Sequence, residues 1–423
     1  MSLSLGVDIG TSGVRTAVLE SDGTVLSHAR APHVANVSSA IDANDWWTAT
    51  AQCLRAQVSA LADIGRSGEE IRGIAIDGTS GSMVLTDAYL VPVGPALMYN
   101  SKGFVREAER IEAACPTGEH ITKGSNSALA RALRLLKTAE RAPAHLLHQA
   151  DFIAAKLMGR GGLSDHNNAL KTGFDPGSAD WPAWIADLVG PSLLPHVDPV
   201  GTAWAHVDPS VAADLGLSPS CQVHAGTTDS IAAFLAAAPL EDDVAVTSIG
   251  STLAIKVLSK QRVDVPSMGL YAHRVRDFWL VGGASNTGGA VLAHFFSTDD
   301  LERLSADIDP DDPTGLDYYP LLEAGERFPV NDPDLRPRLT PRPVSDVAFL
   351  QGLFEGIARI EAQSYALIAA QGGPMPSRIY SAGGASKNTA LTQIRQRALG
   401  VNLPRALHTE ASIGAASLTG LVG

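Results

Sequence analysis

The sequence predicts an α/β protein made of two related domains, residues 1–237 and 238–423, with a central cleft between them. A hairpin pattern at residues 3–19 recurs at residues 244–258, where Ile9-Gly10-Thr11-Ser12 matches Ile249-Gly250-Ser251-Thr252. A pattern of strand, glycine turn and helix at 223–229 has a similar copy at 379–385. Repeats of this length indicate duplicated domains rather than a solenoid of short units, and 423 residues suffice for two hydrophobic cores.

The turns of the two hairpins suit a phosphate. In the first copy, apolar residues alternate on either side of Gly10-Thr11-Ser12-Gly13, which is typical of two antiparallel strands joined by a tight turn. Glycines let successive backbone N–H groups point into one concavity, to which the hydroxyls of Thr11 and Ser12 add donors. Asp8 precedes the turn, where a carboxylate can hold a hydrated Mg²⁺. The alternative is an ordinary hairpin whose small residues only make the turn, but the second copy favours phosphate binding.

The remaining elements follow from apolar periodicity and from the glycines and prolines that bound it. We expect helices at about 44–65, 126–139, 144–158, 349–370 and 411–421, and strands at 71–77 and 278–283. The polar stretch 163–173 is expected to be a loop, and the proline-rich stretch 310–343 a long surface excursion. Residues 236–243 separate the two copies and are the predicted hinge.

Small polar residues follow two predicted strands and are candidates for binding a ligand. The strand 71–77 runs into Gly78-Thr79-Ser80-Gly81, and another strand ends at Asn100. Open α/β sheets bind ligands at the carboxyl ends of their strands, so Ser80 and Asn100 are predicted substrate contacts. They could instead cap turns. In the loop 163–173, Asp165, Asn168 and Lys171 could bind a polyol or only order the loop.

Asp229 is the strongest candidate for a general base. It follows Gly226-Thr227-Thr228 at the start of an alanine-rich helix, and exposed amides at a helix N-terminus can steady a phosphate. Phosphoryl transfer to an alcohol needs bound phosphates, Mg²⁺ and a group that accepts the hydroxyl proton. The alternative is that Asp229 is only an N-cap, which aspartate commonly is. Asp8 and Asp229 are the two candidate metal-binding residues.

Composition limits the partners. The net charge of −13 argues against nucleic acid or an anionic membrane as a partner. The three cysteines are widely spaced and form no metal motif, and no apolar run approaches the ~20 residues of a membrane helix. With no secretory leader pattern at the start of the sequence, we expect a cytoplasmic protein, either a monomer or a homodimer.

These motifs together resemble the FGGY family of carbohydrate kinases over nearly the whole chain. The resemblance rests on Asp8-Ile9-Gly10-Thr11-Ser12, Gly226-Thr227-Thr228-Asp229-Ser230, Ser248-Ile249-Gly250-Ser251-Thr252 and Ser381-Ala382-Gly383-Gly384-Ala385-Ser386-Lys387-Asn388. Residues 148–151 and 164–173 are similar to the short branch of the family that contains D-ribulose kinases. The family implies two ribonuclease-H-like domains, the ATPase fold shared with actin and heat-shock chaperones.

The resemblance also implies an activity and roles for the matching residues. It implies ATP-dependent phosphorylation of the terminal primary hydroxyl of a ketopentose, D-ribulose before D-xylulose, with ATP and Mg²⁺ as cofactors. Asp229 would be the base and Asp8 would lie near Mg²⁺ and the sugar. The phosphates would lie at Gly10, Thr11, Ser12, Gly250, Ser251 and Thr252, and the adenosine at Gly383, Gly384 and Asn388.

One departure from the family concerns the sugar. After Tyr99-Asn100 the family usually has an acidic residue and then a basic one two positions later, whereas this chain has Ser101-Lys102-Gly103. This leaves the identity of the sugar open. The rival hypothesis from another functional class is an ATP-driven switch, like an actin or a chaperone ATPase, that has no sugar substrate.

Overall fold

The computed structural model describes residues 2–33 and 40–422. These residues form two compact units, 1–236 together with 410–423, and 237–409. The first crossing between the units therefore lies within one residue of the predicted domain boundary. The end of the chain differs from the predicted division, because residues 410–423 return to the first unit instead of staying with the second.

Close backbone packing explains this return. A Cβ atom on Gly6 would lie 1.8 Å from the carbonyl oxygen of Ser412, and one on Gly414 would lie 1.9 Å from that of Ala232. The hydroxyls of Ser4 and Thr419 are 2.8 Å apart in a buried hydrogen bond. Two glycines thus let the C-terminal helix lie directly on the first unit, a contact that no local pattern in residues 411–421 reveals.

The first unit contains three sheets and most of the helices. Its strands are β1 (Leu3–Ile9), β2 (Gly13–Leu19), β3 (Val25–Pro32), β4 (Ala40–Ile41), β5 (Ile71–Gly78), β6 (Met83–Thr86), β7 (Ala96–Leu97), β8 (His145–His148), β9 (Leu163–Asp165), β10 (His196–Asp198), β11 (Ala203–His206) and β12 (Gln222–Thr228). Its helices are α1 (Ala43–Asp63), α2 (Val105–Ala114), α3 (Ala128–Thr138), α4 (Gln149–Met158), α5 (His166–Thr172), α6 (Ala183–Val189), α7 (Pro209–Leu215), α8 (Asp229–Ala237) and α13 (Ala411–Ala416).

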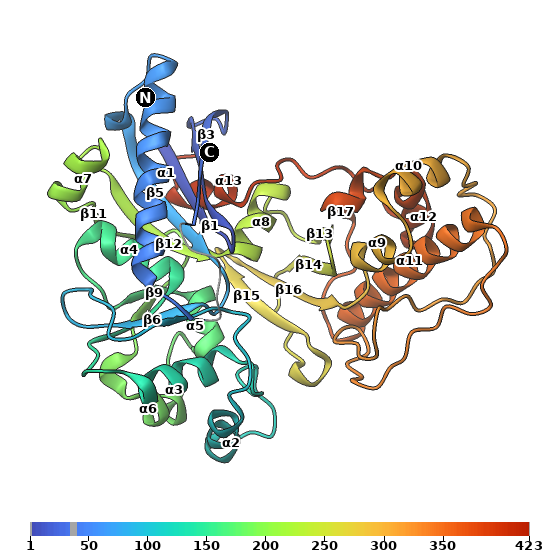
Figure 1. Ribbon diagram of the computed structural model, residues 1–423, viewed down its shortest axis with the longest axis horizontal. Helices are drawn as coiled ribbons and strands as arrows, with labels where there is room; N and C mark the ends of the chain where they lie inside the picture. Colours follow the sequence, from blue (N-terminus) through green and yellow to red (C-terminus); the bar gives the residue numbers. More distant parts are fainter. Residues whose placement is uncertain (1, 34–39, 423) are drawn as a thin grey trace. The chain divides into compact units, whose positions relative to one another are not determined.

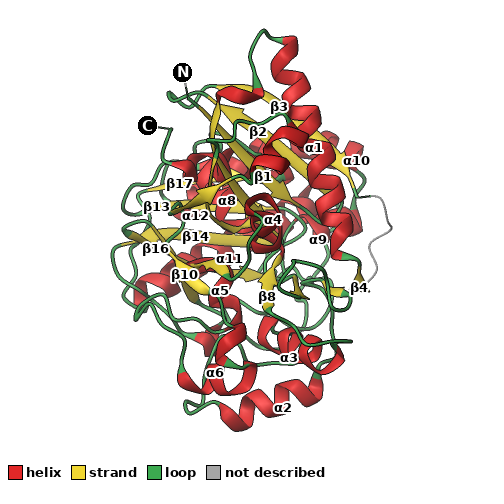
Figure 2. Ribbon diagram, turned by 90° about the vertical axis from the view of Figure 1, so that its left-hand side faces the viewer, coloured by secondary structure: helices red, strands yellow, loops and turns green. Residues whose placement is uncertain are grey.

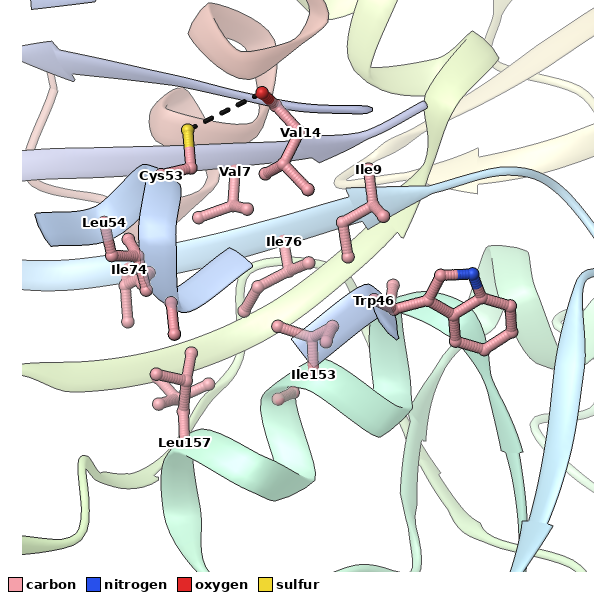
Figure 3. Close-up of a cluster of buried hydrophobic side chains, with 14 of the residues drawn as sticks. Val7, Ile9, Val14, Trp46, Cys53, Leu54, Ile74, Ile76, Ile153 and Leu157 are labelled. Carbon is pink, nitrogen blue, oxygen red and sulfur yellow. Dashed lines mark hydrogen bonds between the residues drawn. The ribbon is translucent and has the colours of Figure 1, made fainter. Parts of the chain in front are cut away.

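The main sheet of this unit has the order β11-β12-β5-β1-β2-β3, and β12, β5 and β1 are parallel neighbours (Figure 1). Side chains alternate between its faces, as strand geometry requires. The odd residues of β1, such as Val7 and Ile9, pack with Trp46 and Leu54 of α1 and Ile153 of α4 in one core (Figure 3). The even positions face α13, because Ser4 and Gly6 contact Thr419 and Ser412.

A smaller sheet, β4-β7-β6-β8, lies beside a cluster of helices in the first unit. Helices α2, α3 and α6 pack against one another there, as Figure 2 shows. The predicted helix 144–158 begins later than expected, because His145–His148 is a strand paired with β6. The predicted loop 163–173 is also wrong. It forms β9 and α5, with Asp165 capping the helix and Gly173 ending it at a φ of 109°.

The second unit repeats the hairpin arrangement of the first. Its elements are β13 (Val244–Ile249), β14 (Leu253–Ser259), β15 (Tyr271–Val275), β16 (Phe278–Ser285), β17 (Arg378–Ala382), α9 (Gly289–Phe295), α10 (Thr298–Ala306), α11 (Asp346–Ala370) and α12 (Thr389–Leu399). The sheet order is β15-β16-β14-β13-β17. The hairpin β13–β14 corresponds to β1–β2, and β17 pairs parallel to β13 as β5 pairs to β1.

This topology corrects one detail of the predicted repeat. By sheet position β17 corresponds to β5, not to β12, so the similarity of 223–229 and 379–385 is local. The proline-rich stretch 310–343 forms no helix or strand longer than isolated bridges, as expected. Helix α11 begins three residues before the predicted start and packs against α10 and α12 (Figure 1), and residues 349–358 are buried on all sides of the helix.

Candidate active site

Three aspartates lie at the carboxyl ends of neighbouring parallel strands in the first unit. Asp8 on β1 is the register partner of Asp77 on β5, and Asp77 is in turn the partner of Thr227 on β12. Asp229 follows β12 directly as the first residue of α8. The carboxyl edge of a parallel sheet is where α/β proteins place ligands, and the structure brings the predicted base and the predicted metal-binding carboxylate to this edge.

The alternation of side chains puts Asp8 and Asp77 on one face of the sheet. Asp8 is an even position of β1, like Gly6, and residues paired in a parallel register point the same way. That face is the one that α13 covers. Helix α8 packs on α13 through the contact between Gly414 and Ala232, so Asp229 begins a helix on the same face.

Asp77 is a site residue that the sequence pattern did not reveal. It is fully buried, and burial together with the charges of Asp8 and Asp229 raises its pKa well above the ordinary value. A raised pKa means that Asp77 keeps its proton to a higher pH than an exposed aspartate does. Burial also raises the pKa of Asp8, against the opposing effect of Arg15, whose Nη1 lies 3.3 Å from the Asp8 carboxylate. Only the pairing of β1 with β5, which is not local in sequence, places Asp77 beside Asp8.

The first hairpin turn has the expected geometry with one difference. The N–H of Gly10 donates to the carbonyl of Gly13 at 3.0 Å, so this amide closes the turn and does not point into a nest. The Nε2 atom of His33 lies 2.9 Å from the carbonyl oxygen of Gly10. Thr11 is half-buried and Ser12 is exposed, so their hydroxyls remain accessible to a phosphate.

The two predicted substrate contacts Ser80 and Asn100 lie on loops that the structure joins. Ser80 is half-buried and Asn100 is exposed. The hydroxyl of Ser82, two residues after Ser80, accepts a hydrogen bond from the N–H of Tyr99 at 2.9 Å. The turn after β5 and the loop after β7 are therefore held side by side.

Asp165 and Asn168 have structural contacts that favour the loop-ordering alternative. The Asp165 carboxylate accepts from the N–H groups of Asn167 and Asn168 and from the Asn168 side-chain amide, at 2.6–3.0 Å. Both side chains are buried. These bonds cap α5. They account for the presence of two polar side chains at buried positions without a bound polyol. Lys171 is half-buried in the last turn of the same helix.

A cavity of about 620 Å³ lies within the second unit, at the end of the β13–β14 hairpin. Four predicted nucleotide contacts line it, Gly250, Ser251, Gly384 and Asn388. The two other contacts predicted in the second unit, Thr252 and Gly383, are their chain neighbours. Leu301, Phe354 and Leu391 supply apolar walls, and Glu302 and Lys387 supply charge. Its size and mixed lining are those of a small-molecule site.

The glycines of the cavity indicate where a ligand fits. A Cβ atom on Gly250 or Gly384 would meet no atom within 4 Å, so both face open space. Gly383 is different, since its φ is 83° and a Cβ there would lie 2.4 Å from the carbonyl of Ile249. Gly383 thus holds the loop against β13, whereas Gly250 and Gly384 leave open space in the cavity.

Asn388 lines the cavity and also has a structural role. Its side-chain oxygen accepts from the N–H of Leu391 at 3.0 Å and caps α12, and its amide donates to the Ser305 hydroxyl at 2.7 Å. Asn388 therefore ties α12 to α10, and its polar atoms are already engaged within the protein.

Comparison with known proteins decides the family. A model of the N-terminal domain of the FGGY family of carbohydrate kinases matches residues 3–236, and a model of the C-terminal domain matches residues 245–421. The chain belongs to the FGGY family of carbohydrate kinases. This confirms the predicted family, the duplicated ribonuclease-H-like fold and the assignment as an enzyme.

Relatives of this FGGY kinase cover most of its length. A xylulose kinase of Staphylococcus epidermidis is 25% identical over 441 residues, which cover 98% of this chain and 86% of that protein. A D-ribulokinase of Saccharomyces cerevisiae is 22% identical over 70% of this chain and 50% of its own. The crystal structure of a xyloylose kinase from Brucella ovis shares the fold, with a TM-score of 0.89 and 21% identity, and the match covers 99% of this chain and 90% of that one. The crystal structure of a xylulose kinase from Rhodospirillum rubrum also shares it, with a TM-score of 0.86 and 21% identity, and the match covers 99% of this chain and 89% of that one.

Two further features of this FGGY kinase bear on its partners. Within residues 2–33 and 40–422, no cluster of three or more His, Cys, Asp or Glu side chains forms a closed metal site. Mg²⁺ typically takes one or two carboxylates and completes its shell with water and phosphate oxygens, so Asp8 and Asp229 fit such an open site. In the same described residues, none of the helices combines the length and the apolar character that crossing a membrane requires.

Proposed function

We propose that this FGGY kinase transfers the terminal phosphoryl group of ATP to the terminal primary hydroxyl of a ketopentose. The observation that carries the proposal is the row of Asp8, Asp77 and Asp229 at the ends of three neighbouring strands. D-ribulose is the first candidate substrate and D-xylulose the second. The names of the relatives support the pentulose class and include both sugars.

Each residue has a chemical task in this proposal. Asp229 accepts the proton of the attacking hydroxyl, since it begins a helix and is only half-buried, so a substrate can reach it. Asp77 is buried beside Asp8, and its raised pKa means that it gives up its proton less readily than an exposed aspartate. Thr11 and Ser12 in one unit, and Ser251 and Thr252 in the other, donate hydrogen bonds to phosphate oxygens. Mg²⁺, held by Asp8 and Asp229, would neutralise phosphate charge.

The cavity of the second unit is the proposed site of the nucleotide. Gly250 and Ser251 lie at its phosphate end, and the apolar side chains Leu301, Phe354 and Leu391 suit the faces of adenine. A Cβ atom added to Gly384 would have no other atom within 4 Å, so a larger side chain there would extend into the cavity. Replacing Gly384 with Val should therefore raise the KM for ATP several-fold and leave the melting temperature nearly unchanged.

A matched control is available for this variant. Gly118 also has no atom within 4 Å of an added Cβ, and it lies outside the cavity. Gly118→Val should leave the KM for ATP unchanged. If both variants have the parental KM for ATP, the cavity is not the nucleotide site.

The proposed activity is tested by ADP release in a coupled assay. The purified chain is supplied with ATP, Mg²⁺ and one of D-ribulose, D-xylulose, pentitols, hexoses or glycerol. The proposal predicts turnover that depends on a pentulose, with the highest kcat/KM for D-ribulose or D-xylulose. Turnover that no sugar increases above the sugar-free rate would contradict it and favour an ATP-driven switch.

A further inference from the structure

The side chain of Arg131 lies buried beneath the two loops proposed to contact the sugar. Arg131 is on α3 and only 4% exposed. Its Nε donates to the carbonyl of Gly81 at 2.9 Å, and its Nη1 donates to the carbonyl of Tyr99 at 2.9 Å. Gly81 follows Ser80 and Tyr99 precedes Asn100, so one guanidinium holds the neighbours of both proposed contacts.

This guanidinium has carbonyl partners in place of the usual carboxylate. Nη1 also donates to the carbonyl of Asn126 at 2.8 Å, in the segment before α3. No carboxylate of residues 2–33 and 40–422 forms an ion pair with Arg131. Burying a cation without a counter-ion is costly unless its donors are used. The planar fork of arginine supplies several donors in fixed directions, which lysine does not.

A second set of hydrogen bonds, from Gln149 and the hydroxyls of Thr79 and Ser82, joins the same two loops. The side-chain oxygen of Gln149, at the start of α4, accepts from the N–H and the hydroxyl of Thr79 at 2.9 and 2.7 Å. The Thr79 hydroxyl lies 2.6 Å from that of Ser82, which accepts from the N–H of Tyr99. A chain of hydrogen bonds thus runs from α4 through the turn after β5 to the loop after β7.

We propose that Arg131, Gln149 and Ser82 are positioning residues that fix the turn 79–82 against the loop 99–101 and so determine how well the sugar binds. The inference rests on the proposed function, because it assumes that Ser80 and Asn100 contact the sugar. These three side chains are themselves buried, so they act through the loops and not by touching the substrate. Loss of any one lets the loops move apart while the hairpins and the nucleotide cavity stay intact.

The sharpest test is Ser82→Ala, which removes one hydroxyl that joins the loops. It should raise the KM for the pentulose about fivefold or more, the change expected from one hydrogen bond of ordinary strength. The KM for ATP and kcat should stay within about twofold of the parental values. The control is Thr86→Val at the end of β6, the strand that follows Ser82. The Thr86 hydroxyl is also buried, but it has no hydrogen-bond partner in the described part of the chain. Thr86→Val should leave all three constants unchanged.

A second pair of variants covers the case in which Ser82→Ala does not fold. Arg131→Lys keeps the charge and loses the fork, and it should raise the KM for the pentulose about tenfold or more. It should also abolish most of the rise in melting temperature that the pentulose gives the wild type. The control is Arg134→Lys, one turn away from the loops on α3, where the guanidinium pairs with Glu107. It should keep the parental KM for the pentulose.

The outcomes separate the two proposals. Wild-type protein without pentulose-dependent turnover overturns the proposed function and the positioning role with it. Wild-type turnover combined with a parental pentulose KM in Ser82→Ala or Arg131→Lys overturns the positioning role alone. Equal losses in the KM for ATP and for the pentulose would also overturn it, since a general loss of structure would give that result.

Discussion

Asp229 is either the general base or only a helix cap, and a single substitution distinguishes these two hypotheses. Its carboxylate accepts from the N–H of Ser230 at 2.6 Å, and its charge contributes to the raised pKa of the buried Asp77. Asp229→Asn keeps the size and the capping ability but removes the proton acceptor. If Asp229 is the base, kcat should fall by about 10²–10⁴-fold with pentulose binding largely kept.

The matched control is Asp208→Asn. Asp208 caps α7, where it accepts from the N–H groups of Ser210 and Val211, and it lies outside the proposed site. Because asparagine and aspartate are equally good caps, Asp208→Asn should turn over at the parental rate. An Asp229→Asn protein that also keeps the parental rate, and whose melting temperature still rises with pentulose, would show that Asp229 is a cap only.

A buried carboxyl in α5 predicts a pH dependence of stability. Burial raises the pKa of Asp165 from 3.8 to about 6. Between these values the folded state keeps a proton that the unfolded chain has released, so the free energy of unfolding contributed by this group falls as pH rises. Asp165→Asn cannot titrate. The melting temperature of Asp165→Asn relative to wild type should therefore increase from pH 4 to pH 7.

Thermal melts at several pH values check this dependence. The control is again Asp208→Asn, because hydrogen bonds from Ser210 and Val211 lower the pKa of Asp208. Its stabilising effect is present above the ordinary pKa and lost as pH falls, so its difference from wild type should be flat above pH 5. A difference between Asp165→Asn and wild type that does not change with pH would mean that Asp165 is ionised in the folded protein.

Among the elements, helices α11 and α12 of the second unit are joined by a buried ion pair. Arg395 and Glu361 are both fully buried, and two guanidinium nitrogens lie 2.6 and 2.8 Å from the two carboxylate oxygens. Glu361 also accepts from the hydroxyl of Thr247 on β13, and Arg395 donates to that of Ser381 on β17. The pair thus fixes the two strands that lead into the turn 250–252 and the loop 383–388.

Removing one partner should be far more costly than removing a surface pair. Arg395→Met leaves a buried carboxylate unpaired and should lower the free energy of unfolding by about 3–5 kcal/mol. Arg303→Met on α10 is the control, since Arg303 and its partner Asp300 are 65% and 45% exposed and 2.8 Å apart, and it should cost about 1 kcal/mol or less. Equal losses in denaturant unfolding would contradict the structural role of the buried pair.

The sequence predicts those elements whose signals are local. The hairpins at 3–19 and 244–258, the strand 71–77 and the helix 349–370 have strong periodicity, and the structure has all of them. The carboxylate Asp77, the strand β8 and the docking of α13 depend on partners distant in the chain, which periodicity does not contain. The short helix α5 was missed although Asp165 and Gly173 bound it, because seven polar-rich residues show little periodicity.

For the site, the local motifs identified the turns but not their supports. Ser80 and Asn100 could be chosen because they follow strands. Arg131 could not, since its role depends on carbonyl groups of loops that lie 30 and 50 residues before it in the chain. The sequence predicts Asn388 as an adenosine contact, and its hydrogen bonds to Leu391 and Ser305 show a structural role as well.

For the whole molecule, catalysis requires the nucleotide and the sugar to meet without water as a competing acceptor. The chain passes between the two units twice, at 236–237 and at 409–410. A hinge between the units would therefore consist of two chain segments. We expect the units to close when both substrates are bound. Small-angle scattering should show a smaller radius of gyration with a pentulose and a non-hydrolysable ATP analogue together than with either one alone.

An unchanged radius of gyration with both ligands demonstrably bound would argue against closure. The predicted hinge, residues 236–243, includes the first crossing but not the second. Replacing Ala238 with Pro would stiffen the first crossing only, and a parental kcat in this variant would indicate that the motion does not depend on that segment.

The central claim is that the phosphoryl group of ATP passes to a sugar hydroxyl and not to water. Phosphorus NMR of the reaction with ATP, Mg²⁺ and D-ribulose or D-xylulose tests it most directly. We expect a phosphomonoester on the terminal primary hydroxyl, formed in equal amount to ADP, with little inorganic phosphate. Inorganic phosphate equal to the ADP formed, with the sugar recovered unchanged, would contradict it.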